Sequence, residues 1–139
     1  MNLISQKLAL NIMLALLSLV MIFHLSVLTQ LISYTIVWAG KLKTVEEMRR
    51  FESISILLNC FFMTVLLLKG NYIKSKIPVK LLNIVLWIFV AIFALNTVGN
   101  LYAETKFELY VFTPLTFISA LLCLRILIKN KQLQIKPKD

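Results

Sequence analysis

Four long apolar runs without a charged side chain constrain this chain more than any other feature. Each lacks Lys, Arg, Asp and Glu over 16 residues or more, and the runs are 8–40, 53–68, 81–103 and 109–124. A helix needs about 20 residues to cross roughly 30 Å of hydrocarbon. Each run can therefore supply one membrane span, the shorter two with flanking residues whose charged heads reach the interface. With 60% apolar residues, the sequence predicts an all-α, integral membrane four-helix bundle.

The spans leave no room for a separate soluble module. We predict one transmembrane domain over residues 1–139, with helices at about 4–28, 45–69, 78–99 and 106–129. The end of the first run, residues 31–40, is too short for another span and carries Tyr34 and Trp38, aromatic residues typical of the headgroup boundary. It is predicted to be an interfacial segment that lies at the boundary or tucks back against the bundle. A cleaved signal peptide is the weaker interpretation, because no small-x-small site follows the first span.

The basic residues are divided unequally between the two sides of this topology. Ten Lys and Arg fall on the side of the termini with one acid, Asp139, whereas the other side has five basic and five acidic residues. Because loops rich in Lys and Arg stay in the cytoplasm, both termini are predicted to be cytoplasmic in a plasma membrane. The basic tail, residues 129–138, is expected to bind anionic lipid. Nucleic-acid binding explains none of the apolar spans.

Local signals mark where the helices begin. Thr44-Val-Glu-Glu47 and Thr105-Lys-Phe-Glu108 are capping boxes, in which the threonine hydroxyl and the glutamate carboxylate each satisfy a free backbone N–H. Pro78 suits a first helical turn. Pro114 lies two or three turns inside the fourth helix, where it is expected to bend the helix or loosen its outer end.

Polar residues within the spans gather toward the predicted outer side. Glu52, Ser55 and Asn59 share one face of the second helix, and Asn96 and Asn100 share one face of the third. Polar groups in lipid usually face the bundle interior or a cavity. The candidate ligand-binding residues are therefore those at this end with polar or aromatic side chains: His24, Trp38, Lys41, Arg50, Glu52, Asn96, Asn100 and Glu108.

Each candidate also has a structural interpretation. His24 can be a hydrogen-bonded packing residue, and the two asparagines can bridge helices. Glu108 can simply cap its helix, and Trp38 can anchor the interface. Cys60 and Cys123 differ in depth by roughly 9 Å, which is too far for a disulfide. One histidine and scattered carboxylates match no compact metal-ligand spacing, so neither a metal nor another cofactor is expected.

Two stretches carry a family resemblance: residues 24–43, with His24 and Trp38-Ala-Gly-Lys-Leu42, and residues 96–116, with Val98-Gly-Asn100 and Phe112-Thr-Pro114. They resemble an uncharacterised family of small four-helix bacterial membrane proteins. Its pattern is a His, then Trp-Gly-Gly-Arg/Lys-Leu, then Val-Gly-Asn and Phe-Thr-Pro. Ala39 stands where that pattern has its first Gly. The resemblance implies no known activity, and its motifs fall on the predicted outer side.

These observations leave three functional hypotheses. The first is a bundle that binds or transports a small molecule or ion in a polar pocket open to the outside, with transport needing an oligomer or a partner. The second is a non-catalytic accessory or assembly subunit that docks on a membrane partner protein. The third is an outer-leaflet lipid-modifying enzyme with His24 as the base, the weakest of the three because no nucleophile or metal accompanies that histidine.

Overall fold

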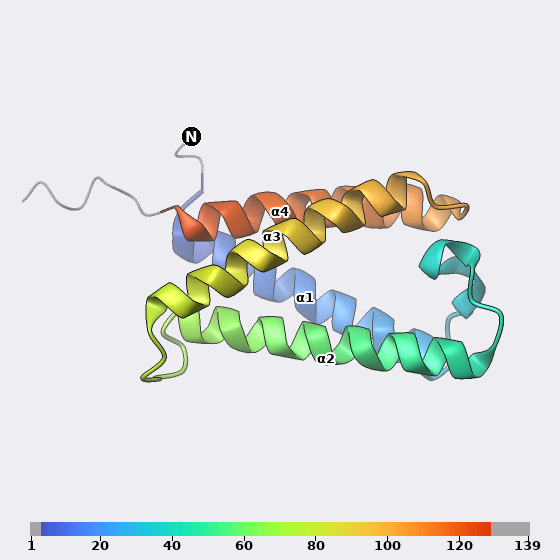
Figure 1. The fold of residues 1–139 in the computed structure, drawn as a ribbon, viewed down its shortest axis with the longest axis horizontal. Helices are drawn as coiled ribbons and strands as arrows, with labels where there is room; N and C mark the ends of the chain where they lie inside the picture. The colour runs from blue at the N-terminus through green and yellow to red at the C-terminus, as the bar shows by residue number, and fades with distance from the viewer. Residues whose placement is uncertain (1–3, 129–139) are drawn as a thin grey trace, which may run out of the picture.

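The computed structural model describes residues 4–128, which form an all-helical bundle (Figure 1). Four helices dominate it: α1 (Gln6–Leu28), α2 (Val45–Lys69), α3 (Val79–Leu101) and α4 (Thr113–Leu127). A π-helical turn, η3 (Glu108–Phe112), leads directly into α4, and two 3-10 turns, η1 (Tyr34–Ile36) and η2 (Trp38–Gly40), lie between α1 and α2. With η3 joined to α4, all four helices are long and apolar enough to cross a membrane. The predicted helical bundle is confirmed at this level, and four such helices indicate a multi-pass membrane protein.

The helices alternate in direction, so the bundle has two distinct ends. We call the end where α1 and α3 begin the lysine end, since Lys7, Lys69 and Lys80 lie there. The opposite end, where α2 and α4 begin, is the glutamate end, since it holds Glu52 and Glu108. The pair α3 and α4 packs most extensively, followed by α1 with α2 and α1 with α4.

The main apolar core fills only the half of the bundle toward the lysine end. Phe62 of α2 stacks on Phe89 of α3 with ring centroids 3.9 Å apart, and both side chains are buried. Around them lie the other buried apolar residues of the four helices: Ala9, Leu10, Met13, Leu17, Val65, Leu66, Leu82, Leu86, Leu122, Cys123 and Ile126. Toward the glutamate end, α1 and α2 diverge from α3 and α4 (Figure 1). The main apolar core thus holds the helix pairs together at the lysine end.

Residues 29–43, which we call the connecting segment, occupy the diverging end (Figure 1). Val37 and Leu42 of this segment are buried in a second apolar cluster with Val27 of α1 and Met48 of α2. Of the two placements expected for this stretch, the structure has it tucked back against the bundle. The connecting segment thereby supplies contacts that the diverging helices cannot make directly.

The first capping box forms in α2 with a small shift. The hydroxyl of Thr44 accepts the N–H of Glu47 at 3.1 Å, as the sequence predicts. The carboxylate of Glu47 accepts the N–H of Lys43 at 2.9 Å, one residue before the expected partner. Two backbone N–H groups are still satisfied, so α2 begins where the capping signal predicts.

The fourth helix begins differently from its prediction. The N–H of Thr113 bonds to the carbonyl of Glu108, five residues back, which makes this stretch a π-helical turn. Pro114 follows directly and has no N–H to donate, so the wider turn takes up the break in the α-helical ladder. The predicted loosening at the outer end is thus a π turn, and the α-helical part starts at Thr113 and ends at Leu127. Residue 129 and the basic tail lie outside the described residues.

Other helix bounds agree with or shift from the prediction by a few residues. The third helix continues to Leu101, past the predicted end at Gly99, and Pro78 caps it rather than occupying its first turn. Gly99 has open space around it, so nothing in the packing forces the helix to end there. Cys60 and Cys123 are both free thiols, the first exposed and the second buried.

Candidate functional site

Two carboxylates are buried at the glutamate end. The Glu52 side chain on α2 is 1% exposed, and the Glu108 side chain at the start of η3 is 7% exposed. Burying an ionised carboxylate without partners is very unfavourable, so the surroundings of each must supply proton donors or positive charge. The donors define the candidate site.

Glu52 uses both of its carboxylate oxygens. Its Oε2 lies 2.6 Å from Nδ1 of His24 on α1, and its Oε1 accepts the indole N–H of Trp38 at 2.9 Å. A contact of 2.6 Å between a ring nitrogen and a carboxylate oxygen requires a proton between them, so this is a hydrogen bond between the two side chains. Glu52 therefore ties α1, α2 and the connecting segment together.

Glu108 does more than cap its own helix. Its Oε2 accepts the backbone N–H of Ala39 at 2.7 Å and the hydroxyl of Thr105 at 2.8 Å. The capping bond from the Glu108 N–H to the Thr105 hydroxyl is long at 3.4 Å. The carboxylate thus serves as an acceptor for a residue far away in the sequence, and the cap alone does not explain its placement.

Adjacent residues of the connecting segment reach different helix pairs. Trp38 bonds to Glu52 on the α1 and α2 side, and Ala39 bonds to Glu108 on the α3 and α4 side. If Gly40 had a Cβ atom, it would lie 3.4 Å from the Cγ2 of Thr105. Residues 38–40 therefore form a clip that spans the diverging end of the bundle.

The clip has an unusual backbone. Trp38 and Ala39 both have φ of 56°, and Gly40 has φ of 71°. Left-handed backbone is uncommon for residues other than glycine and persists where the surroundings hold it. Here the hydrogen bonds from Trp38 and Ala39 to the two carboxylates hold the backbone in this conformation. The conformation also gives a physical reason for Gly at position 39 in the pattern that the chain resembles, because glycine adopts this φ without strain.

The backbone of Ala39 yields a stability prediction. Ala39→Gly is expected to raise the free energy of unfolding by about 0.5 kcal/mol, because relief of left-handed strain exceeds the extra chain entropy of glycine. Ala94→Gly on the exposed face of α3 is the matched control and is expected to lower it by about 1 kcal/mol. Titration with SDS in mixed micelles measures both. Equal losses in the two variants would contradict the left-handed conformation at position 39.

Aromatic rings flank both carboxylates. Trp38 packs on Phe51 with ring centroids 4.8 Å apart, beside Glu52 in the sequence. Phe23, which precedes His24, stacks on Phe107 at 5.7 Å and meets Phe112 edge-on at 5.1 Å. Phe107 directly precedes Glu108. Trp38 thus contacts Glu52 directly, and the three phenylalanine rings pack at the same end of the bundle as Glu108.

The structure joins some of the predicted site residues and separates others. His24, Trp38 and Glu52 meet directly, and Glu108 is linked to them through Ala39. The other four candidates have side chains that form no hydrogen bond or ion pair within residues 4–128: Lys41, Arg50, Asn96 and Asn100. Asn96 is exposed, so it does not face the same interior as His24 and Glu52. Ligand binding by these residues stays a prediction.

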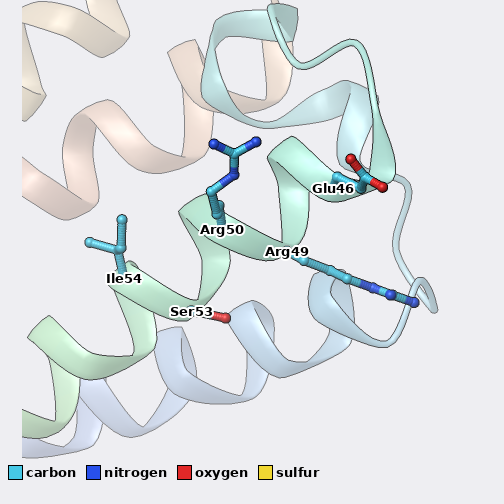
Figure 2. Close-up of a pocket in the computed structure, with 5 residues that line it drawn as sticks. All are labelled: Glu46, Arg49, Arg50, Ser53 and Ile54. Carbon is cyan, nitrogen blue, oxygen red and sulfur yellow. The ribbon is translucent and has the colours of Figure 1, made fainter.

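Arg50 lines a separate feature of the surface. A shallow depression on α2 is bordered by Glu46, Arg49, Arg50, Ser53 and Ile54. Figure 2 shows the guanidinium groups of Arg49 and Arg50 pointing away from each other, and neither reaches a carboxylate in an ion pair. The depression lacks the buried, partnered groups of the Glu52 site.

Sequence reasoning missed several members of the site. The N–H of Ala39 and the hydroxyl of Thr105 are donors to Glu108, and the rings of Phe23, Phe107 and Phe112 pack beside it. The second capping box signals Thr105, but a backbone donor has no signature in the sequence.

Deeper in the bundle, Asn59 donates to the carbonyl of Leu17 at 3.3 Å, and its buried Oδ1 has no partner among the described residues. Among those residues, no three His, Cys, Asp or Glu side chains are grouped to hold a metal ion.

Four helices long and apolar enough to span a membrane indicate a multi-pass helical membrane protein, and this one has a closed polar clip at one end. No protein-family model matches the chain, and no curated protein or solved structure matches it either. The likeness to small bacterial four-helix proteins therefore stays a resemblance. The geometry of the Glu52 and Glu108 site carries the functional conclusion.

Proposed function

We propose that this protein binds a small molecule or ion at Glu52 and Glu108, and that the connecting segment is the lid of this site. The observation that carries the proposal is that two buried carboxylates from different helix pairs are both occupied by adjacent residues of one strained turn. In this arrangement the lid fills the site with its own N–H groups. A ligand gains access when the clip releases.

The distribution of charge supports an outward orientation for the glutamate end. Ten of the fifteen Lys and Arg lie on the side of the termini, and the opposite side has equal numbers of basic and acidic residues. By the positive-inside rule the lysine end faces the cytoplasm of a bacterial inner membrane, and the lid faces outward. The ligand would then enter from outside the cell.

Ionisable groups inside a membrane span favour a binding role over a purely structural one. Apolar packing already holds the bundle at the lysine end. A carboxylate–imidazole pair in the opposite half is costly to desolvate and stabilises little compared with an apolar replacement. Left-handed backbone at three consecutive positions adds strain, which is common at ligand clamps and switch regions.

Fluorescence of Trp38 tests the proposal, since Trp38 and Trp87 are the only two tryptophans in the sequence. In a Trp87→Phe background, Trp38 reports the lid alone. Trp87 lies on α3 and is 57% exposed, so its replacement should not disturb the clip. We expect a saturable rise in acrylamide quenching of Trp38 when a ligand of the correct class binds.

Four probes cover the main ligand classes: phenethylammonium chloride, sodium chloride, sodium benzoate and phenethyl alcohol. The control is Glu52→Gln, which keeps an acceptor for the Trp38 indole but changes the charge. A saturable response to any probe that weakens in the control supports a binding site. If none of the four produces one, the binding function is wrong.

An accessory subunit is the second candidate, because both carboxylates find donors within the chain itself. In that case the clip only shapes a surface for a membrane partner. Purification in mild detergent separates the two functions. A stoichiometric partner, lost from the Glu108→Ala variant but kept by Glu104→Ala, favours the accessory role, whereas a pure protein with a responsive lid favours binding.

A further inference from the structure

We infer that the ligand of this site is an organic ammonium ion, with a charged nitrogen that carries N–H groups and an apolar body. The inference rests on the proposed binding function and specifies the class of ligand. It follows from the donors that now occupy the site, from the charge of the site, and from the rings around it.

The two donors that the lid supplies in the closed state are both N–H groups. The indole N–H of Trp38 lies 2.9 Å from Glu52, and the amide N–H of Ala39 lies 2.7 Å from Glu108. When the lid releases, each carboxylate loses one N–H donor, and an ionised carboxylate can only accept. A ligand that replaces the lid must therefore donate hydrogen bonds. An ammonium group has N–H donors and forms charge-assisted bonds that are shorter and stronger than those of neutral donors.

The charge of the site favours a positively charged ligand. Both acceptors are carboxylates, which are negative when ionised, and Glu108 forms no ion pair among residues 4–128. The basic side chains in this region do not cancel that charge by contact, because Lys41, Arg50 and Lys106 are exposed and form no ion pair with Glu108. An anion would be repelled, and a neutral ligand would leave the carboxylate uncompensated.

The surrounding rings favour an organic cation over an inorganic one. Phe23, Phe107 and Phe112 pack together at the same end of the bundle as Glu108, and Phe51 packs on Trp38, whose indole N–H bonds to Glu52. Aromatic faces attract ammonium groups and also cover apolar substituents. Hard metal cations instead require six or more oxygen ligands, and the described residues offer no cluster of that kind.

Two sources can supply an organic ammonium at this place. One is a free amine in the external medium, and the other is the primary ammonium of a phosphatidylethanolamine headgroup. Both present the same N–H donors to the carboxylates. The composition of the vesicles used in the test distinguishes them.

The test uses the full chain with Trp87→Phe in phosphatidylcholine vesicles and follows acrylamide quenching of Trp38. We expect phenethylammonium to bind at least tenfold more tightly than phenethyltrimethylammonium, which has the charge without N–H donors, and than phenethyl alcohol, which has no charge. Equal or tighter binding of either analogue overturns the inference. A saturable response to sodium chloride or benzoate without one to phenethylammonium also overturns it, but leaves the binding function standing.

Two variants test whether phenethylammonium binds at Glu108. Glu108→Gln should weaken phenethylammonium binding at least tenfold, because the amide keeps an acceptor for Ala39 and loses the charge. Glu104→Gln is the matched control, since Glu104 is exposed at the same end, and it should bind as the parent does. Equal weakening in both contradicts the assignment. If Glu108→Gln does not fold, the comparison of the three phenethyl compounds on the parent decides alone.

Vesicles with added phosphatidylethanolamine complete the test. If the lipid occupies the site, the apparent affinity for phenethylammonium falls as its fraction rises, and the quenching baseline of Trp38 rises. If free amines are the ligands, both stay unchanged. Either result supports an ammonium site and identifies its source.

Discussion

Replacement of Glu52 with alanine is expected to lower the free energy of unfolding by about 3 kcal/mol, because it removes a buried side chain that is the acceptor for both His24 and Trp38. His24 loses its contact at 2.6 Å, and the indole of Trp38 loses its acceptor at 2.9 Å. SDS titration in mixed micelles, followed by circular dichroism, measures the loss.

A double-mutant cycle identifies the cause of that loss. His24→Ala, Glu52→Ala and the combined variant should show a coupling energy of about 1–3 kcal/mol, since the two side chains are in direct contact. Glu46→Ala on the exposed surface of α2 is the matched control and should change stability by less than about 0.5 kcal/mol. Additive effects of the two replacements would contradict the contact between His24 and Glu52.

A cross-link between Gly40 and Thr105 is expected to have the largest effect on the protein. A Cβ at position 40 would lie 3.4 Å from the Cγ2 of Thr105, so Gly40→Cys with Thr105→Cys should form a disulfide under mild oxidation. Cys60→Ala removes the exposed native thiol. Because the bond closes a long loop, it should raise the free energy of unfolding by about 4 kcal/mol.

The same cross-link locks the lid. Oxidised protein should lose the ligand-dependent rise in Trp38 quenching, and reduction with dithiothreitol should restore it. The strain of cysteine at position 40 is present in both states, so the comparison isolates the bond itself. Gly40→Cys with Glu104→Cys is the control and should not cross-link. An unchanged ligand response in the oxidised protein would mean that the clip is not a lid.

Much of the fold could be predicted because the solvent of a membrane protein is apolar. Charge-free runs reveal spans directly, and the Thr44 capping box placed the start of α2 correctly. Rotation of the helices could not be predicted in the same way. Their surfaces are apolar on all sides, so periodicity does not identify the inner face. For this reason the orientation of Asn96 was predicted incorrectly: it was expected to face the interior and is exposed.

The sequence predicted how deep the site residues lie in their helices, but it did not predict their hydrogen-bond partners. His24 and Glu52 lie at similar depth in their helices, and they meet. Glu108 has the sequence signature of a helix cap, yet its carboxylate accepts the backbone N–H of Ala39. Every residue except proline has such an N–H, so the sequence does not mark Ala39 as a donor. The reach of the connecting segment depends on a left-handed turn at Trp38 and Ala39, and neither residue type favours that backbone.

The half-filled core has a mechanical consequence. The main core, with Phe62 stacked on Phe89, fixes the four helices near the lysine end, and their other ends are joined by a few hydrogen bonds and by the rings of Phe23, Phe107 and Phe112. From Phe89 to its end at Leu101, α3 makes a lever about 18 Å long. A tilt of about 10° at this fulcrum would carry the tip of the helix through about 3 Å, the length of one hydrogen bond. Breaking the clip therefore requires only a slight pivot, with no repacking of the aromatic pair.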